Sequence, residues 1–137
     1  MRINILSVLT LFFFIFSCSE DKNEMDETEM FFSKKYESEY FGISFKKEET
    51  KTNGKLESER QYLYVEIINS KKLNPILNKN TILENECSTI AKFIIDSVEF
   101  ENIPFRPKEI QIDVRNESGN WIFEQYETKT ITFNLTE

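Results

Sequence analysis

Alternation of hydrophobic and polar residues along several stretches of the chain predicts β-strands. The first such stretch covers 41–45 and continues as polar sequence to residue 52. Asn53 and Gly54 form a strong hairpin signal, because both residues tolerate the left-handed backbone that a two-residue turn requires. The return strand is predicted over 55–69, and its charged first half is expected to project beyond the core as a ribbon.

A helical repeat of apolar residues follows the first predicted hairpin. Thr81 and Glu84 fit a capping box, in which Thr81 is the N-cap. Apolar residues then recur at three- and four-residue spacing, as on one face of a helix. This stripe consists of Leu83, Cys87, Ile90, Ala91, Ile94 and Val98. The pattern predicts an amphipathic helix that ends near residue 98.

Two more strands are predicted in the C-terminal part. Alternation is clear over 108–115, turn-forming residues fill 116–120, and a last strand is expected over 121–135. These elements together predict an α+β fold with two layers and the order β-β-α-β-β. The four-stranded sheet is expected to be mainly antiparallel, with one helix packed on one face.

The N-terminal segment has the layout of a signal peptide. Arg2 supplies a positive charge, and an apolar run of about 14 residues follows, whereas a membrane-spanning helix needs about 20. The run ends at Ser17 and Cys18. This ending resembles the lipobox of bacterial lipoproteins, in which a small residue precedes the cysteine that becomes lipidated. The resemblance implies a signal peptide over 1–17 and an acylated N-terminal Cys18.

A lipoprotein of this kind has the lipid bilayer as its first partner, held through the acyl chains on Cys18. Ser19 follows the cysteine, where lipoproteins kept at the inner membrane often have Asp, so the resemblance favours the outer membrane, on its periplasmic or surface side. Glu20 and Asp21 are open to two interpretations. They resemble an acidic surface-export signal of some Gram-negative lipoproteins, and they also suit a solvated tether.

Acidic residues dominate the segment after the cysteine, and such a composition favours an extended chain. The lipidated cysteine and acidic tether are predicted over 18–35, and a single α+β domain over 36–137. Met30, Phe31 and Phe32 interrupt the acidic composition. We expect them to dock onto the domain rather than onto the membrane surface, because exposed phenylalanines promote aggregation.

Composition excludes several classes of function. The chain has no histidine, which excludes Ser-His-Asp and Cys-His catalytic groups and histidine-containing zinc sites. Its three glycines are scattered and cannot form a phosphate-binding loop. The net charge of −7 argues against nucleic acid as a partner. We therefore expect no cofactor, no metal and no catalytic residue.

Tyr62 and Tyr64 are the candidate ligand-binding residues. They are two positions apart on a predicted strand and thus share the face opposite the helix. Charged and polar residues predicted on the same face are Arg60, Glu66, Gln111, Asp113 and Arg115. Such a face suits the binding of a protein or a glycan. It also suits an ordinary solvated sheet face, because Tyr is a good strand former.

Other candidate residues support weaker interpretations. Cys87 lies on the apolar stripe and is expected in the core, with a reactive thiol as the alternative. The charged hairpin over 46–55 is either a solvated ribbon or a recognition finger. Pairs of acidic residues invite a glycosidase interpretation, although no motif flanks them. These pairs are Glu84 with Glu86, Glu99 with Glu101, and Glu124 with Glu127.

The sequence thus predicts a small, membrane-anchored, non-catalytic envelope lipoprotein that binds a protein or a glycan. Two alternatives stay open. One is an immunity-type or inhibitor lipoprotein that neutralises a basic toxin or enzyme, which the acidic net charge allows. The other is a carboxylate-dependent hydrolase of cell-wall or surface glycans.

Overall fold

The computed structural model describes residues 24–97, 106–120 and 122–135. The predicted signal peptide and Cys18 lie outside these described residues, as do Glu99 and Glu101. The elements in chain order are α2 (Glu27–Tyr36), β1 (Tyr40–Thr52), β2 (Lys55–Ile68), the short 3₁₀ helix η2 (Asn74–Ile76), α3 (Asn80–Ser97), β3 (Glu109–Asn120) and β4 (Phe123–Asn134).

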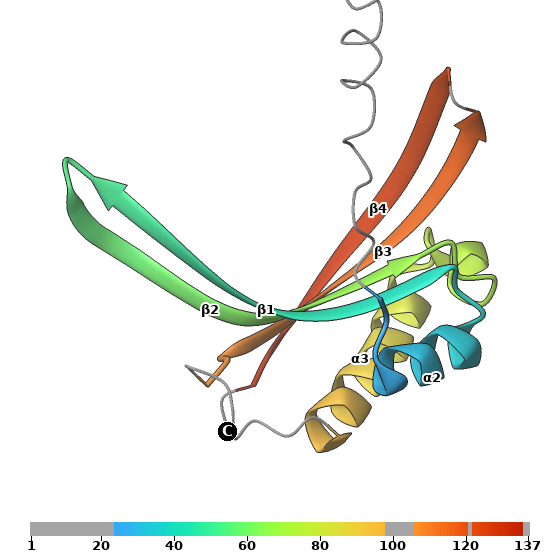
Figure 1. Cartoon of the computed structure of the whole chain (residues 1–137), viewed down its shortest axis with the longest axis horizontal. Helices are drawn as coiled ribbons and strands as arrows, with labels where there is room; N and C mark the ends of the chain where they lie inside the picture. The colour runs from blue at the N-terminus through green and yellow to red at the C-terminus, as the bar shows by residue number, and fades with distance from the viewer. Residues whose placement is uncertain (1–23, 98–105, 121, 136–137) are drawn as a thin grey trace, which may run out of the picture.

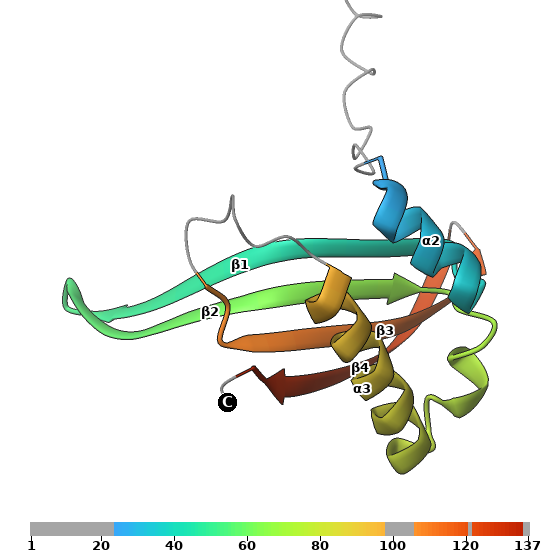
Figure 2. The same cartoon turned by 90° about the horizontal axis from the view of Figure 1, so that it is seen from below.

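The four strands form one mixed sheet in the order β1-β2-β3-β4. The outer pairs, β1 with β2 and β3 with β4, are antiparallel hairpins, while the central pair of β2 and β3 is parallel. The crossover between the parallel strands contains α3, as such connections commonly do. Both α2 and α3 lie on the same side of the sheet (Figures 1 and 2). The predicted α+β class and the mainly antiparallel four-stranded sheet are therefore confirmed.

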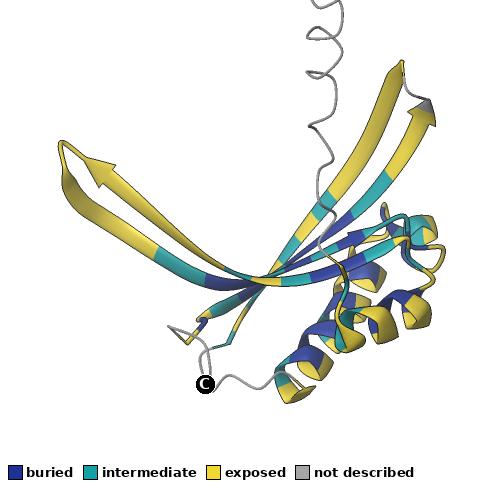
Figure 3. Cartoon of the chain, viewed as in Figure 1, coloured by how far each residue is buried: buried dark blue, intermediate teal, exposed yellow. Residues whose placement is uncertain are grey.

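All four strands run side by side over only a short region. β2 and β3 are paired at seven positions, where Tyr62–Ile68 lies along Glu109–Arg115. Because the two strands are parallel and offset, each hairpin continues alone beyond this region. We call residues 46–61 the first arm and residues 116–127 the second arm. Both arms diverge from the centre of the sheet in Figure 1, and Figure 3 shows that they are mostly exposed.

The hydrophobic core lies between the sheet and the two helices. The predicted stripe of α3 faces it, with Leu83, Cys87, Ile90, Ala91 and Ile94 all buried. The sheet contributes Phe41, Leu63, Val65, Ile67, Ile110, Ile112 and Val114. Full burial of each large apolar side chain stabilises the fold by about 1.5–3 kcal/mol. The alternation of apolar and polar residues in the strands thus reflects the burial of one face of the sheet against the helices.

Helix α2 corrects the prediction that residues 27–35 belong to an extended tether. The Asp26 side chain accepts a hydrogen bond from the Glu29 amide, and Glu29 reaches back to the Asp26 amide, so the two acids form a capping box. Acidic residues also suit the positive end of the helix dipole. Phe32 is fully buried and stacks on Phe41 with ring centroids 4.8 Å apart. The expected docking of Phe32 onto the domain is thus observed.

Two further local predictions are wrong in detail. The Lys79 carbonyl accepts the first hydrogen bonds of α3, so Thr81 lies inside the helix and is not its N-cap. Residues 116–120 belong to β3 and do not form the predicted turn. Gly119 has a φ of 128°, and a Cβ there would clash with the Phe123 carbonyl oxygen. Gly119 therefore serves the close approach of two strands, and the chain reverses between Asn120 and Phe123.

The first hairpin turn is as predicted. Asn53 and Gly54 have φ values of 52° and 78° and connect the paired residues Thr52 and Lys55. Both turn residues thus adopt the left-handed backbone that matches the twist of an antiparallel hairpin. The predicted ribbon beyond the core is also confirmed, since the charged half of this hairpin forms the first arm.

Candidate functional site

The candidate site is the face of the sheet opposite α2 and α3. Among the described residues, no helix covers this face. Register places the residues of one face opposite one another across the strands, and β2 contributes Tyr62 and Tyr64 from its centre. The predicted companions Arg60, Glu66, Gln111, Asp113 and Arg115 share this face, as do Lys46, Glu48 and Glu109. We call this surface the helix-free face.

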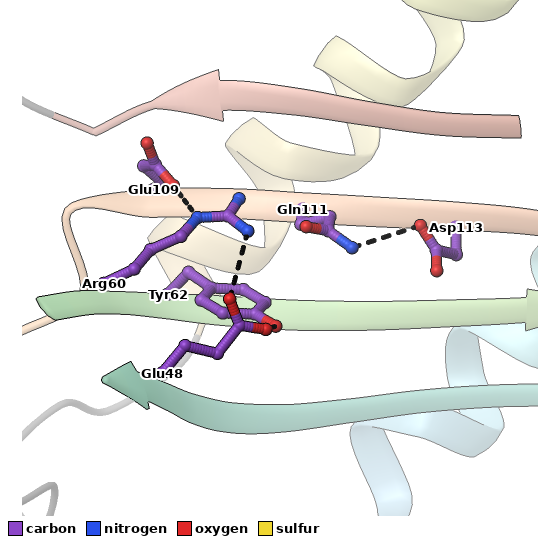
Figure 4. Close-up of polar contacts among 6 residues, drawn as sticks. All are labelled: Glu48, Arg60, Tyr62, Glu109, Gln111 and Asp113. Carbon is purple, nitrogen blue, oxygen red and sulfur yellow. Dashed lines mark hydrogen bonds and ion pairs between the residues drawn. The ribbon is translucent and has the colours of Figure 1, made fainter. Parts of the chain in front are cut away.

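Tyr62 lies beneath a charged side chain. The guanidinium carbon of Arg60 is 4.2 Å from the centroid of the Tyr62 ring, and the Tyr62 hydroxyl donates a hydrogen bond to Glu48 (Figure 4). Arg60 also donates from Nε to Glu109 Oε2 over 2.6 Å. Its Nη1 lies 3.8 Å from Glu48 Oε2. Arg60 therefore links three strands while it covers the ring, and Tyr62 is only 3% exposed.

Tyr64 occupies a second cluster on the same face. Its hydroxyl donates a 2.9 Å hydrogen bond to Asp113 Oδ2, and the ammonium of Lys46 lies 3.5 Å from its ring centroid. Gln111 Nε2 lies 3.4 Å from Asp113 Oδ1, as Figure 4 shows. Burial, followed by the Asp113 carboxylate, raises the pKa of Tyr64. The phenol thus stays protonated and remains a donor to Asp113 throughout the physiological range.

A third cluster surrounds Arg115 where β3 enters the second arm. Its Nη2 lies 3.1 Å from Glu66 Oε1 and its Nη1 lies 3.5 Å from Glu117 Oε1. The Tyr126 ring, which is 73% exposed, is 5.9 Å from the guanidinium carbon. Each of the cations Lys46, Arg60 and Arg115 on the helix-free face therefore lies against a carboxylate or a tyrosine ring.

The structure changes what the two predicted ligand-binding tyrosines can do. Their position on the helix-free face is as the sequence indicated, but Arg60 covers one ring and Lys46 contacts the other. Tyr62 therefore offers little surface for direct stacking. Arg60 could have been linked to Tyr62 by its two-residue spacing alone. Glu48, Lys46 and Glu109 could not, because their proximity depends on strand register.

The remaining candidates are a buried cysteine and an acidic pair that strand register separates. Cys87 is fully buried, and burial, with smaller contributions from Glu86 and Glu84, raises the pKa of its thiol to about 12. It is a core residue, as expected. Register places Glu124 and Glu127 on opposite faces of β4. In the part of the chain that the structure describes, no group of three or more acidic or cysteine side chains could hold a metal.

Described residues line cavities at two places on the surface. One of about 500 Å³ lies along the second arm, where Asn116, Glu124 and Tyr126 are among its lining residues. The other, of about 200 Å³, lies between the start of α3 and β4 and is lined by Asn80, Leu83, Glu84, Lys129, Thr130 and Ile131. Neither cavity contains the Tyr62 or Tyr64 clusters.

Comparison with known proteins finds no matching family model, no matching curated protein and no matching solved structure. Within the described residues, neither helix has the length and apolar character needed to cross a bilayer.

Proposed function

We propose that the protein is a small bacterial envelope lipoprotein, anchored through acylated Cys18 and acting as a non-catalytic binding module for a protein partner. The observation that carries this proposal is the helix-free face together with the two arms that extend it. The arm residues contribute little to the core, since most described positions in 46–61 and 116–127 are exposed. The arms therefore extend the helix-free face with surface that the core does not use.

A protein is favoured over a glycan as the partner. Sugar recognition by aromatic residues requires exposed ring faces. Arg60 occupies the face of Tyr62 and Lys46 lies over Tyr64, which leaves Tyr126 as the exposed tyrosine of the three clusters. The helix-free face instead presents charges of both signs at fixed positions, held by contacts such as Arg60 with Glu109 and Arg115 with Glu66. Patterned charges of this kind provide specificity and orientation between two proteins.

The carboxylates of this face suit binding better than hydrolysis. Asp113 accepts from Tyr64 and Gln111, while Glu48 and Glu109 contact Arg60. A general acid needs a raised pKa and a substrate cleft beside it. The cavity along the second arm is lined by both Glu124 and Glu127, but it lies on the exposed hairpin, and register places these two acids on opposite faces of β4. The glycan hydrolase alternative therefore has less support than the binding module.

Site-directed photo-cross-linking in intact cells tests the binding face. A photoreactive residue at Ser44, which is exposed on the helix-free face beside Tyr64, is expected to capture one discrete partner protein. The same residue at Thr89, which is exposed on α3, is the matched control and should capture none. Arg60→Glu should abolish the Ser44 product. Equal capture from both positions, or capture that survives the charge reversal, contradicts the proposed face.

The anchor is tested separately. Cys18→Ala is expected to remove the acylation site and move the protein from the membrane fraction to the soluble fraction or leave an unprocessed precursor. Cys87→Ala is the control, because Cys87 is a buried core residue and should not affect partitioning. Unchanged partitioning of Cys18→Ala contradicts lipid anchoring.

A further inference from the structure

The two outer edges of the sheet differ. On β1, the Ile43 amide donates a 2.6 Å hydrogen bond to Glu29 of α2, so the helix occupies part of this edge. The rest of β1 carries closely spaced charges from Lys46 to Lys51, which discourage edge pairing. Among the described residues, no strand pairs with the outer edge of β4, which is 12 residues long. Such an edge is a ready template for another strand.

The direction of the backbone groups on β4 follows from two contacts. The Leu135 amide donates to the Lys108 carbonyl just before β3, and the Asn69 amide donates to the Arg115 carbonyl across β2 and β3. Backbone N–H and C=O groups point to alternate sides of a strand at successive residues. The first contact therefore directs these groups of the odd-numbered residues of β4 toward β3. The second contact agrees, because it directs the groups of the odd-numbered residues of β3 toward β2 and leaves the even-numbered ones facing β4. The backbone groups of Thr128, Thr130 and Thr132 therefore point outward along the free edge.

We propose that the outer edge of β4 pairs with β4 of a second copy of this chain, antiparallel about a twofold axis at Thr128. This interface goes beyond the proposed function and does not depend on it. Thr128 would face Thr128 of the second copy as a hydrogen-bonded pair, and Tyr126 would face Thr130. An axis at this position pairs nearly the whole of β4, because Thr128 lies at the middle of the strand.

Charge complementarity selects this register. With the axis at Thr128, Glu127 of each copy lies opposite Lys129 of the other, in the pairs whose side chains are closest. Neither residue forms an ion pair with another described residue. An axis at Tyr126 or Thr130 would also satisfy the outward backbone groups, but it would place Glu127 opposite Gln125 or Phe133. The same register aligns Phe123 with Phe133 on the helix side of the sheet.

Helix α3 offers cover for an added strand. In Figure 2, α3 crosses β3 and β4 and its first turns extend past the outer edge of β4. The cavity of about 200 Å³ lies at this junction, between Leu83 of α3 and Ile131 of β4. Ile82, in the first turn of α3, is 49% exposed. A fifth strand at this edge would thus have apolar surface beside it on the helix side.

Disulfide trapping tests the interface in cells that express the full chain. Thr128→Cys should yield a covalent homodimer, because Cα atoms of a hydrogen-bonded pair are about 5.5 Å apart and a disulfide spans about 4.4–6.8 Å. Thr130→Cys is the matched control, since its two copies would be about 13 Å apart along the strands. The unsubstituted chain controls for Cys18 and Cys87.

A Thr128→Cys homodimer well above the Thr130→Cys level supports the interface. Equal yields from the two variants, or no product from either, overturn it. A disulfide product that contains a different protein also overturns it, because the edge would then accept a foreign strand.

Charge reversal tests the register. In the Thr128→Cys background, Glu127→Lys or Lys129→Glu alone should lower the homodimer yield about tenfold, because two attractive pairs become repulsive. The double variant exchanges the two charges and should restore the yield. Both side chains lie at the sheet edge, and circular dichroism of each variant checks that the fold is retained. Failure of the double variant to recover, with folding intact, contradicts the axis at Thr128.

Discussion

Single side chains on the helix-free face connect strands that are distant in the sequence. The contacts of Arg60 with Glu109 and of Tyr64 with Asp113 each join residues 49 positions apart. Asp113 is only 9% exposed, so its carboxylate depends on its protein donors rather than on water. The polar face is therefore part of what holds β2 and β3 together.

Tyr64→Phe is expected to destabilise the fold by about 1–3 kcal/mol, because it removes a donor from a buried carboxylate. Urea denaturation followed by circular dichroism measures the change. Tyr126→Phe is the control, since the Tyr126 ring is 73% exposed, and its effect should be within about 0.5 kcal/mol. Equal effects of the two variants would show that the hydrogen bond to Asp113 contributes nothing.

The buried thiol of Cys87 predicts a loss of stability at alkaline pH. Burial raises its pKa to about 12, whereas an unfolded thiol ionises near its ordinary value of about 8.5. Between these two pKa values, the thiol of the unfolded chain has lost its proton while the thiol of the native chain retains it. The free energy of unfolding should therefore fall as the pH rises from about 9 toward 12, by at most about 1.4 kcal/mol per pH unit.

Urea denaturation at pH 8, 8.5 and 9 measures the start of this slope, where a tyrosine with its ordinary pKa of about 10 is still mostly protonated. Cys87→Ala removes the titrating group, so its stability should change less over the same range. Thiol labelling should also be slow until the protein unfolds, because Cys87 is fully buried. Rapid labelling of Cys87 under native conditions contradicts its assignment to the core.

Helix α2 covers part of one edge of the sheet. Its Glu29 serves two purposes, since one carboxylate oxygen completes the capping box with Asp26 and the other accepts the Ile43 amide. Phe31 stacks on Phe93 of α3 at 5.7 Å, so α2 also contacts the second helix. The start of the folded domain is consequently at Asp26, only a few residues after the expected lipidation site.

Glu29→Ala should release the edge of β1 and weaken the start of α2. Hydrogen exchange of the Ile43 amide is expected to become at least tenfold faster, and the fold should lose about 1–2 kcal/mol. Glu27→Ala is the matched control, because Glu27 is an exposed acid in the same turn. Equal protection of Ile43 in both variants would contradict the bridging role of Glu29.

The whole molecule consists of a compact centre and two projecting arms. Ion pairs along the first arm, such as Lys47 with Glu49 and Glu59, lie at exposed positions. Exposed pairs contribute little to stability. The first arm is thus expected to fold because it continues a hairpin that the centre already stabilises, and its length is available for contacts with other molecules.

A shortened first arm tests this separation. Residues 49–59 can be replaced by Asn-Gly, which would join the paired residues Glu48 and Arg60 by the same type of turn as the native hairpin. The free energy of unfolding should change by less than about 1 kcal/mol. A loss of several kcal/mol would show that the arm stabilises the centre and would weaken its assignment to partner binding.

Local pattern was sufficient for most elements of the fold and insufficient for two of them. The apolar stripe of α3 and the Asn53-Gly54 turn were predictable, because each depends on residues a few positions apart. The sequence did not predict α2, because the acidic residues around it indicated an extended tether. The helix is held by the burial of Phe32 and Tyr36, which only the packing of the core reveals. The sequence did not predict the extension of β3, because Asn116 and Gly119 are residues typical of turns. In the structure they pair with Glu127 and Glu124 of β4.

The candidate site, too, was predictable from the sequence only in part. The sequence by itself determined which side chains share a face of each strand, because alternation is a property of the extended backbone. Only the tertiary structure decided that Arg60 contacts Glu48 and Glu109 on the two neighbouring strands, and that no described strand pairs with the outer edge of β4. These features depend on strand order and register, which are set by the packing of the whole apolar core and not by any short segment.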